Sequence, residues 1–366
     1  MLKQLAQTAV EGNAEVRQCL DFLMANEKIK YIAVSYTTEL GHFDIMQAGI
    51  VGSENDINTG LDVLKRRLLA RIEGVSLVQN PTKTPTADHV IFNLAKAPIN
   101  FDFLSWLVVS EMTRRREGAP APLKVQWFHG NDGKSSIDTP KKLQNFNGIF
   151  RPLLVLFGAI EEEFGAGRLV ESCSLGPAVE AHRSGEDVPQ LEVPSELMKV
   201  IREDFAAKWV KPPVTITLRE SEHYPHRNSN LEEWIRLARW LRGQGEEVVF
   251  IRDTAKAMEK IEGFDDYPAA SIDLLCRAAV YAQARANLFV SNGPAMLAVF
   301  GDKPWLIFNE VQNEGTYPAN TDEGWLQCAG IRPPEQWPWS SKRQRIIWKA
   351  DTFEVMRDAW IEHIAG

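Results

Sequence analysis

One stretch of the sequence, residues 214–308, alternates short apolar runs with longer amphipathic ones. Strand-like runs occupy residues 214–218, 248–251, 288–291 and 305–308, and helix-like spacing occupies residues 231–242 and 271–284. Strands and helices that alternate in this way form βαβ units around a parallel sheet. Ligands of such sheets bind beyond the carboxyl ends of the strands. Functional residues are therefore expected directly after the strands.

The first half of the chain repeats this alternation. Strand-like runs lie at residues 30–35, 75–78, 89–94 and 124–128, and helix-like runs at residues 56–73, 103–116 and 150–164. The polar segment 176–193 is the predicted linker, and a chain of 366 residues favours two domains over one. The sequence thus predicts α/β domains at residues 1–185 and 186–350. A last helix is expected at residues 351–366, with Asp351 as its cap and Glu354 completing a capping box.

Composition narrows the class of partner and the compartment. The formal charge is −8, whereas nucleic-acid binding needs a basic footprint. The four cysteines form no C-x-x-C pair, which predicts neither a disulfide framework nor a metal site and favours a reducing compartment. The sequence contains no signal-peptide pattern and no apolar run long enough to span a membrane. We therefore expect a cytoplasmic protein that has no membrane span and does not bind nucleic acid.

A cationic cluster follows the strand at residues 214–218. Arg219 stands at the strand end, and His226 and Arg227 precede Asn230, the predicted N-cap of the next helix. Helix N-termini bind anions, and arginine forks onto phosphate oxygens. The cluster suits a diphosphate, with Arg219 and Arg227 as the leading contacts.

The alternative for this cluster is a solvated loop in which Arg219 pairs with Glu220 or Glu222.

A second polar cluster, Ser291-Asn292-Gly293-Pro294, follows the strand at residues 288–291. Pro294 fits the first position of a helix, and Gly293 allows backbone to approach a ligand closely. The cluster predicts a site for a second anion or a sugar hydroxyl. The alternative is a sharp turn that needs glycine and proline for its geometry alone.

Both clusters lie in segments that resemble a known family. The run LFVSNGPAMLAVFGDKP resembles the D-T-G-x-x-H-x-A-A-A segment of heptosyltransferase-like glycosyltransferases of the GT-B fold, with Gly293, Ala298 and Pro304 in step. The run HRNSNLEEWIRLARWL resembles another segment of that family, in which Arg227 takes the cationic place. Arg219 gives a looser likeness to fucosyltransferase-type GT-B proteins. Two departures are Ser291 and Met296, which stand where the family has aspartate and histidine.

The resemblance implies two Rossmann-like domains whose parallel sheets face each other across a cleft. The C-terminal domain would hold a nucleotide-sugar, and the N-terminal domain a glycan, lipid-linked or protein acceptor. The last helix would cross back to the N-terminal domain. Transfer would need no metal or other cofactor, because cations and helix dipoles stabilise the leaving diphosphate. The general base would be Asp44 or His42, or else Glu39, in the loop ELGHFD.

Two other functions stay open on the sequence. One is a nucleotide-sugar epimerase of the same fold, with paired acid and base residues in a closed cleft. The other is a non-catalytic protein that binds a sugar or nucleotide, which the replaced aspartate and histidine permit. The sequence contains no G-x-S-x-G, P-loop or G-x-G-x-x-G motif, so hydrolase, NTPase and NAD-dependent functions lack support.

Overall fold

The computed structural model describes residues 29–37, 42–50, 86–94, 99–128, 140–162, 167–170, 173–312 and 320–365, the first two ranges by their backbone alone. The chain divides into two compact units, Met1–Pro81 and Thr82–Gly366. In the first unit, β1 (Ile29–Thr37) pairs antiparallel with β2 (His42–Ile50). The prediction of a loop is therefore wrong from His42 onward, because His42 and Asp44 lie in β2 opposite Thr37 and Ser35.

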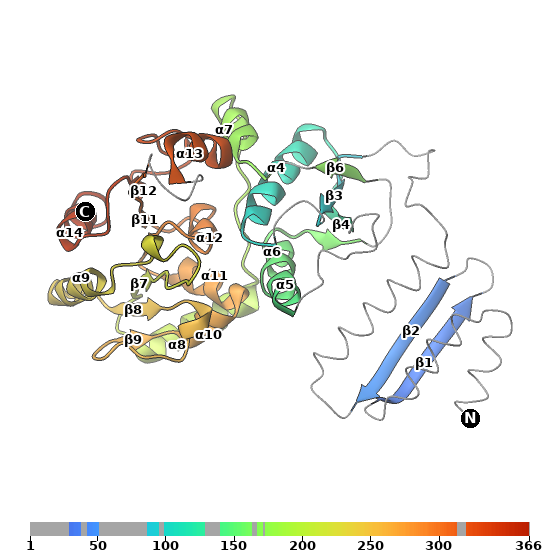
Figure 1. Cartoon of the computed structure of the whole chain (residues 1–366), viewed down its shortest axis with the longest axis horizontal. Helices are drawn as coiled ribbons and strands as arrows, with labels where there is room; N and C mark the ends of the chain where they lie inside the picture. The colour runs from blue at the N-terminus through green and yellow to red at the C-terminus, as the bar shows by residue number, and fades with distance from the viewer. Residues whose placement is uncertain are drawn as a thin grey trace. The chain divides into compact units, whose positions relative to one another are not determined.

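The second unit contains a six-stranded parallel sheet near the C-terminus (Figure 1). Its strands are β7 (Val214–Thr217), β8 (Val248–Ile251), β9 (Asp265–Asp266), β10 (Ala286–Val290), β11 (Trp305–Phe308) and β12 (Gln344–Ile347). Their order across the sheet is β12-β11-β10-β7-β8-β9, and every neighbouring pair is parallel. When these six strands are numbered from 1 to 6 along the chain, their order across the sheet is 6-5-4-1-2-3, which is the strand order of a Rossmann sheet.

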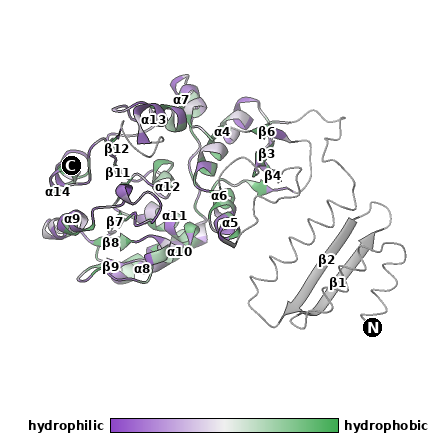
Figure 2. Cartoon of the chain, viewed as in Figure 1, coloured by the Kyte–Doolittle hydropathy of each residue, from purple (hydrophilic) through white to green (hydrophobic). Residues whose placement is uncertain are grey.

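Helices bury both faces of this sheet. On one face lie α9 (Leu231–Gly243) and α14 (Phe353–His363), and on the other lie α10 (Pro268–Ile272), α11 (Leu274–Gln283) and α12 (Ala295–Val299). Alternate strand residues supply the two cores: Val248 and Phe250 face α9, whereas Val249 and Ile251 face the other side. Burial on both faces explains why β8 is a continuous apolar run, and Figure 2 colours this strand green.

A smaller parallel sheet lies earlier in the same unit. It consists of β3 (His89–Asn93), β4 (Lys124–Phe128), β5 (Ile160–Glu161) and β6 (Arg168–Val170), in the order β5-β4-β3-β6. Its helical segments are α4 (Asp102–Arg116), α5 (Pro140–Asn145), a π-helical turn at Phe146–Phe150, α6 (Arg151–Leu156) and α7 (Gly176–Arg183). In its core the ring of Phe103 stacks on those of Trp106 and Phe150, and the ring of Phe92 contacts all three edge to face. The predicted α/β class with two Rossmann-like sheets is confirmed.

Backbone hydrogen bonds join the two sheets' layers through the segment between α7 and α8 (Ser195–Lys208). The Leu191 amide donates to the Phe300 carbonyl at 2.9 Å, and the Glu192 amide donates to the Leu156 carbonyl at 2.8 Å. One hydrophobic core, which contains Phe103 as well as Phe289, runs through both layers.

Some predicted element bounds need correction. The helix expected at 150–164 ends at Leu156 and is followed by β5. The expected linker at 176–193 begins with helix α7, and the helix expected at 271–284 is divided at Asp273 between α10 and α11. In the described part of the chain, α14 packs against α9, β11 and β12, and the predicted crossing of this helix to the N-terminal domain stays a prediction.

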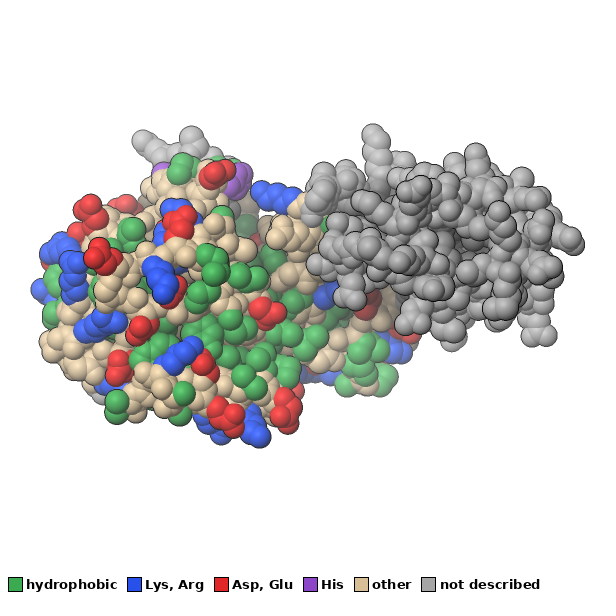
Figure 3. Space-filling view, turned by 90° about the horizontal axis from the view of Figure 1, so that it is seen from below, with side chains coloured by type: hydrophobic (Ala, Val, Ile, Leu, Met, Phe, Trp, Pro, Cys, Tyr) green, Lys and Arg blue, Asp and Glu red, His purple; other side chains and the backbone are tan. Residues whose placement is uncertain are grey.

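The surface shows no field of one charge sign on the face drawn in Figure 3, where acidic and basic side chains of the described residues are interspersed. Within the described part of the chain, every helix is too short or too polar to cross a membrane.

Candidate functional site

The strand order of the six-stranded sheet reverses between β7 and β10. From β7 the chain continues through α9 to β8 on one side, and from β10 it continues through α12 to β11 on the other. A crevice forms outside the carboxyl ends of strands at such a switch point. Both polar clusters of the sequence lie at this place. The Nη2 of Arg227 donates to the carbonyl oxygen of Ser291 at 3.1 Å, which joins the two clusters directly.

A polar pocket of about 80 Å³ lies beside this contact. It is lined by residues that follow four neighbouring strands: His226, Arg227 and Asn228 after β7, Val290 and Ser291 at the end of β10, Phe308, Asn309, Glu310, Gln312 and Asn320 around and after the end of β11, and Lys349, Ala350 and Asp351 after β12. The predicted contacts Arg227, His226 and Ser291 are thus brought together. Arg227 is half-buried, whereas His226 is exposed.

The side chain of Arg219 makes its contacts within the loop that follows β7. Its side chain is buried, with 9% of the residue exposed, and its guanidinium donates to the carbonyl oxygens of His223 and Tyr224 and to Asn228 Oδ1. Arg219 is also absent from the residues that line the pocket. The guanidinium of Arg219 thus holds the loop that follows β7, and a contact of Arg219 with a diphosphate stays a prediction. Glu220, one of the two partners that the alternative gave Arg219, pairs with Arg252.

The N-terminus of α9 already holds a carboxylate of the chain itself. Asp351 Oδ2 accepts hydrogen bonds from the Asn230 backbone amide at 2.9 Å and from Trp234 Nε1 at 2.7 Å. Burial is the main reason that the pKa of Asp351 is raised, although these two bonds oppose the shift. Asn230 is the N-cap residue as predicted, but its side chain makes no capping bond. A carboxylate of the chain itself thus lies at this helix end, and a ligand anion there stays a prediction.

The turn Ser291–Pro294 is fixed mainly by packing. A Cβ atom on Gly293 would lie 2.4 Å from Phe101 Cδ2, so only glycine fits against this ring. Asn292 Oδ1 accepts a hydrogen bond from the Ala295 amide at 2.9 Å, and Pro294 is the N-cap residue of α12. Of the four residues, Ser291 is the one that lines the pocket.

Sequence reasoning missed several polar residues of this edge. Asn309 and Asn320 are buried and joined by a hydrogen bond of 2.9 Å, and Glu310 and Lys349 lie at the pocket beside them. Asn309 and Glu310 directly follow the strand at 305–308, and Lys349 follows β12 closely. The rule that function follows strand ends, applied to every strand, would have found all three of these residues.

A buried ion pair ties β7 to β8 at the same edge. Arg252, which follows β8, forks onto both carboxylate oxygens of Glu220, and Lys256 approaches Glu220 at 3.5 Å. Burial alone would raise the pKa of Glu220, but the hydrogen bonds and charge of Arg252 outweigh it and lower the pKa below its ordinary value. Glu220 is therefore ionised at neutral pH.

The predicted base residues Asp44 and His42 lie in β2, and their side chains are outside the described residues. Glu39 lies outside the described residues altogether. Their catalytic role stays a prediction. Among the residues that the structure describes, His, Cys, Asp and Glu side chains do not gather in groups of three that could hold a metal ion.

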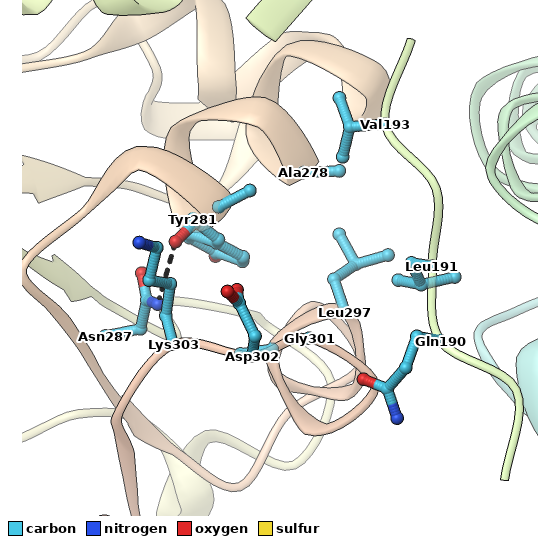
Figure 4. A pocket seen from close by; sticks show the side chains of 12 residues that line it. Gln190, Leu191, Val193, Ala278, Tyr281, Asn287, Leu297, Gly301, Asp302 and Lys303 are labelled. Carbon is cyan, nitrogen blue, oxygen red and sulfur yellow. Dashed lines mark hydrogen bonds between the residues drawn. The ribbon is translucent and has the colours of Figure 1, made fainter. Parts of the chain in front are cut away.

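A second cavity, of about 140 Å³, lies at the opposite edge of the sheet, near the amino ends of β10 and β11 (Figure 4). Apolar side chains such as Leu191, Val193 and Leu297 line much of it. Beside them, the side-chain Nδ2 of Asn287 donates to the Tyr281 carbonyl. Although this cavity is the larger, it is remote from the carboxyl ends of the strands. The candidate functional site is therefore the polar pocket at the switch point.

Comparison with known proteins gives similarities of fold. No protein-family model and no curated protein matches the chain. Among solved structures, it is similar to ADP-heptose LPS heptosyltransferase II of E. coli, with 12% identity and a TM-score of 0.43 over 74% of this chain and 98% of that one. A glycosyl transferase family 9 protein of Veillonella parvula has 10% identity and a TM-score of 0.40 over 62% and 81% of the two chains. UDP-GlcNAc 2-epimerase of Methanocaldococcus jannaschii has 9% identity and a TM-score of 0.34 over 76% and 92%.

Proposed function

We propose that the chain is a glycosyltransferase that moves a sugar from a nucleotide-sugar to a hydroxyl group of an acceptor. The observation that carries this proposal is the contact between Arg227 and Ser291 at the switch point of the sheet. The two sequence segments that resemble heptosyltransferase-like proteins meet at this contact, although 64 residues separate Arg227 from Ser291. Ligands of Rossmann sheets bind at such a point.

The pocket offers the chemistry that a departing nucleoside diphosphate needs. In the proposed reaction, the bond between the anomeric carbon and the diphosphate oxygen breaks, and the acceptor oxygen forms the new bond to that carbon. Arg227 and Lys349 would stabilise the charge that develops on the diphosphate, as fixed cations do in a site with few waters. Glu310 would accept hydrogen bonds from ribose or sugar hydroxyls. The acceptor's proton would pass to Asp44 or His42, the bases named from the sequence.

We propose that transfer proceeds without a metal ion, because Arg227 and Lys349 supply the positive charge that a metal would otherwise bring. Activity should then survive EDTA.

The test is a thermal-shift screen of the full chain against UDP-, GDP-, TDP-, ADP- and CMP-sugars, followed by turnover assays with the donor that binds. A ligand that binds the folded chain raises the melting temperature by mass action. We expect one nucleotide class to raise it, and Arg227→Met to reduce that rise. Transfer to an added acceptor would support a glycosyltransferase, whereas isomerisation of the donor without an acceptor would identify an epimerase. Binding without turnover would indicate a binding protein.

A further inference from the structure

The loop that follows β7, residues 219–229, is built around one buried guanidinium. We call this segment the Arg219 loop. The Nη1 of Arg219 donates to the Tyr224 carbonyl at 3.0 Å and to Asn228 Oδ1, and its Nη2 donates to the His223 carbonyl. A guanidinium has five donors in a rigid fork, so several acceptors around it fix their mutual geometry. The guanidinium therefore fixes the carbonyls of His223 and Tyr224 and the side chain of Asn228 relative to one another.

The two ends of the Arg219 loop are also tied to each other. The Arg219 amide donates to Ser229 Oγ at 2.9 Å, and the Ser229 amide donates to the Arg219 carbonyl at 2.9 Å. Asn228 bonds Ser221 twice, accepting from its amide at 3.0 Å and donating to its carbonyl at 2.9 Å. Hydrogen bonds thus join the two ends of the loop, and the guanidinium of Arg219 bonds the carbonyls between them.

The middle of the loop holds a backbone conformation that is unfavourable for its residue. Tyr224 has a φ of 53°, in the left-handed region, and is followed by a 3₁₀ turn, Pro225–Arg227. A non-glycine residue there is strained, and such strain persists only where surrounding contacts impose it. The bond from Arg219 to the Tyr224 carbonyl is one such contact. The turn that Tyr224 starts ends at Arg227, the residue that reaches Ser291.

We infer that Arg219 is a positioning residue: it fixes the loop so that Arg227 stands at the switch point, and anion binding depends on it although it touches no anion. This inference rests on the proposed function. A free arginine side chain loses rotamer entropy when it binds a phosphate, and a chain held in its bound position loses less. The substitution of Arg219 should therefore weaken anion binding through Arg227.

The experiment measures the affinity of the full chain for inorganic pyrophosphate by calorimetric titration in magnesium-free buffer. Arg227→Met should weaken binding by roughly tenfold to a hundredfold, as expected for a lost charge-assisted hydrogen bond. Arg219→Met should weaken it by a similar factor. Both changes act through the same contact. The affinity of the double variant for pyrophosphate should therefore stay within about threefold of that of Arg227→Met.

Three further variants separate positioning from charge and from general damage. Arg219→Lys keeps the charge but lacks the fork, so it should bind as weakly as Arg219→Met. Asn228→Ala leaves both arginines in place but removes an acceptor from the loop, and it should also weaken binding. Arg239→Met removes a positive charge from an exposed position on α9, and its affinity should stay within about twofold of the unchanged chain. The melting temperature of each variant shows that it is folded.

Two results would overturn the inference while leaving the proposed function intact. One is full affinity in folded Arg219→Lys, or in Asn228→Ala if the Arg219 variants do not fold. The other is a double variant whose loss equals the product of the single losses, because that result indicates direct contact by Arg219. If the unchanged chain does not bind pyrophosphate, the proposed function fails, and the inference fails with it.

Discussion

At the scale of single residues, three arginines beside β7 and β8 have three different roles. Arg219 holds backbone carbonyls of its own loop, Arg252 pairs with buried Glu220, and Arg227 reaches the switch point. The sequence indicates that the edge is cationic, but it does not say which acceptor each guanidinium finds. A strand-end arginine can satisfy its donors on nearby carbonyls as well as on a ligand. The sequence therefore predicts Arg219 and Arg227 as equal ligand contacts, whereas in the fold Arg227 lines the pocket and Arg219 does not.

The Glu220–Arg252 pair gives a prediction at this scale. Glu220→Gln should lower the free energy of unfolding by about 1.5–3 kcal/mol at neutral pH, because buried Arg252 loses its charge-assisted hydrogen bonds to Glu220 and keeps the exposed Glu259 carboxylate, 3.6 Å away, as a counter-charge. The pKa of Glu220 is lowered in the folded state, so ionised Glu220 stabilises the fold above the ordinary value of 4.5. That contribution is lost as the pH falls below 4.5 toward the lowered folded value. The difference between the variant and the unchanged chain should therefore shrink in acid.

Urea denaturation at a series of pH values measures this difference. Glu222→Gln is the matched control, because Glu222 is an exposed residue of the same loop, and its effect should stay within about 0.5 kcal/mol. A difference between Glu220→Gln and the unchanged chain that is independent of pH would contradict the assigned role of the carboxylate.

At the scale of elements, the N-termini of α9 and α14 cap each other. Asp351, just before α14, accepts from the Asn230 amide and Trp234 at the start of α9. In return, Glu233 in the first turn of α9 accepts from the Phe353 amide at 2.6 Å. Each helix thus receives a carboxylate from the other at its positive end, a favourable position for a negative charge. The two helices lie on the same face of the sheet (Figure 1).

This mutual capping of α9 and α14 explains why two capping predictions are wrong. Thr352, not Asp351, is the N-cap of α14, and its hydroxyl accepts from the Val355 amide. Glu354, which was expected to complete the capping box with Asp351, instead accepts a hydrogen bond from Arg236 of α9. The residue types at both helix starts are the ones that local rules favour. Their partners lie more than a hundred residues away, so a local pattern could not identify them.

We expect Asp351→Ala to lower the free energy of unfolding by about 0.5–2 kcal/mol, the usual loss for a helix cap. The substitution leaves the Asn230 amide and Trp234 Nε1 without their acceptor. Chemical denaturation of the full chain measures the loss. Asp358→Ala is the control, since Asp358 is exposed on α14 and pairs only with its neighbour Arg357 among the described residues. Equal effects of the two substitutions would refute the mutual capping of α9 and α14.

Elements buried on both sides of the sheet were predicted well. Strands β8 and β11 begin and end where their apolar runs do, because buried parallel strands need continuous apolar sequence. Shorter elements failed: β5 has two exposed residues, and α10 is separated from α11 by Asp273 alone. The bounds of β5 depend on tertiary contacts rather than on apolar spacing. The boundary between α10 and α11 depends on a cap, because the side chain of Asp273 accepts from the Cys276 amide.

At the scale of the whole molecule, the described part of the second unit, Thr82–Gly366, is built around two parallel sheets. The layers meet in one core, and the Gly293 turn of the C-terminal sheet packs against Phe101, which follows β3 of the smaller sheet. The alternation of elements predicted this architecture from the sequence. The strand order, and with it the switch point that brings Arg227 to Ser291, became apparent only from the fold.

The central claim is that the switch point of the six-stranded sheet binds the diphosphate of an activated sugar. The most direct measurement is a crystal structure of the full chain with the nucleoside diphosphate selected by the thermal-shift screen. We predict that a phosphate oxygen lies within hydrogen-bonding distance, about 2.7–3.2 Å, of the Arg227 guanidinium, at the carboxyl ends of β7 and β10. A diphosphate bound instead in the cavity beside Asn287, or anywhere away from Arg227, would contradict the claim.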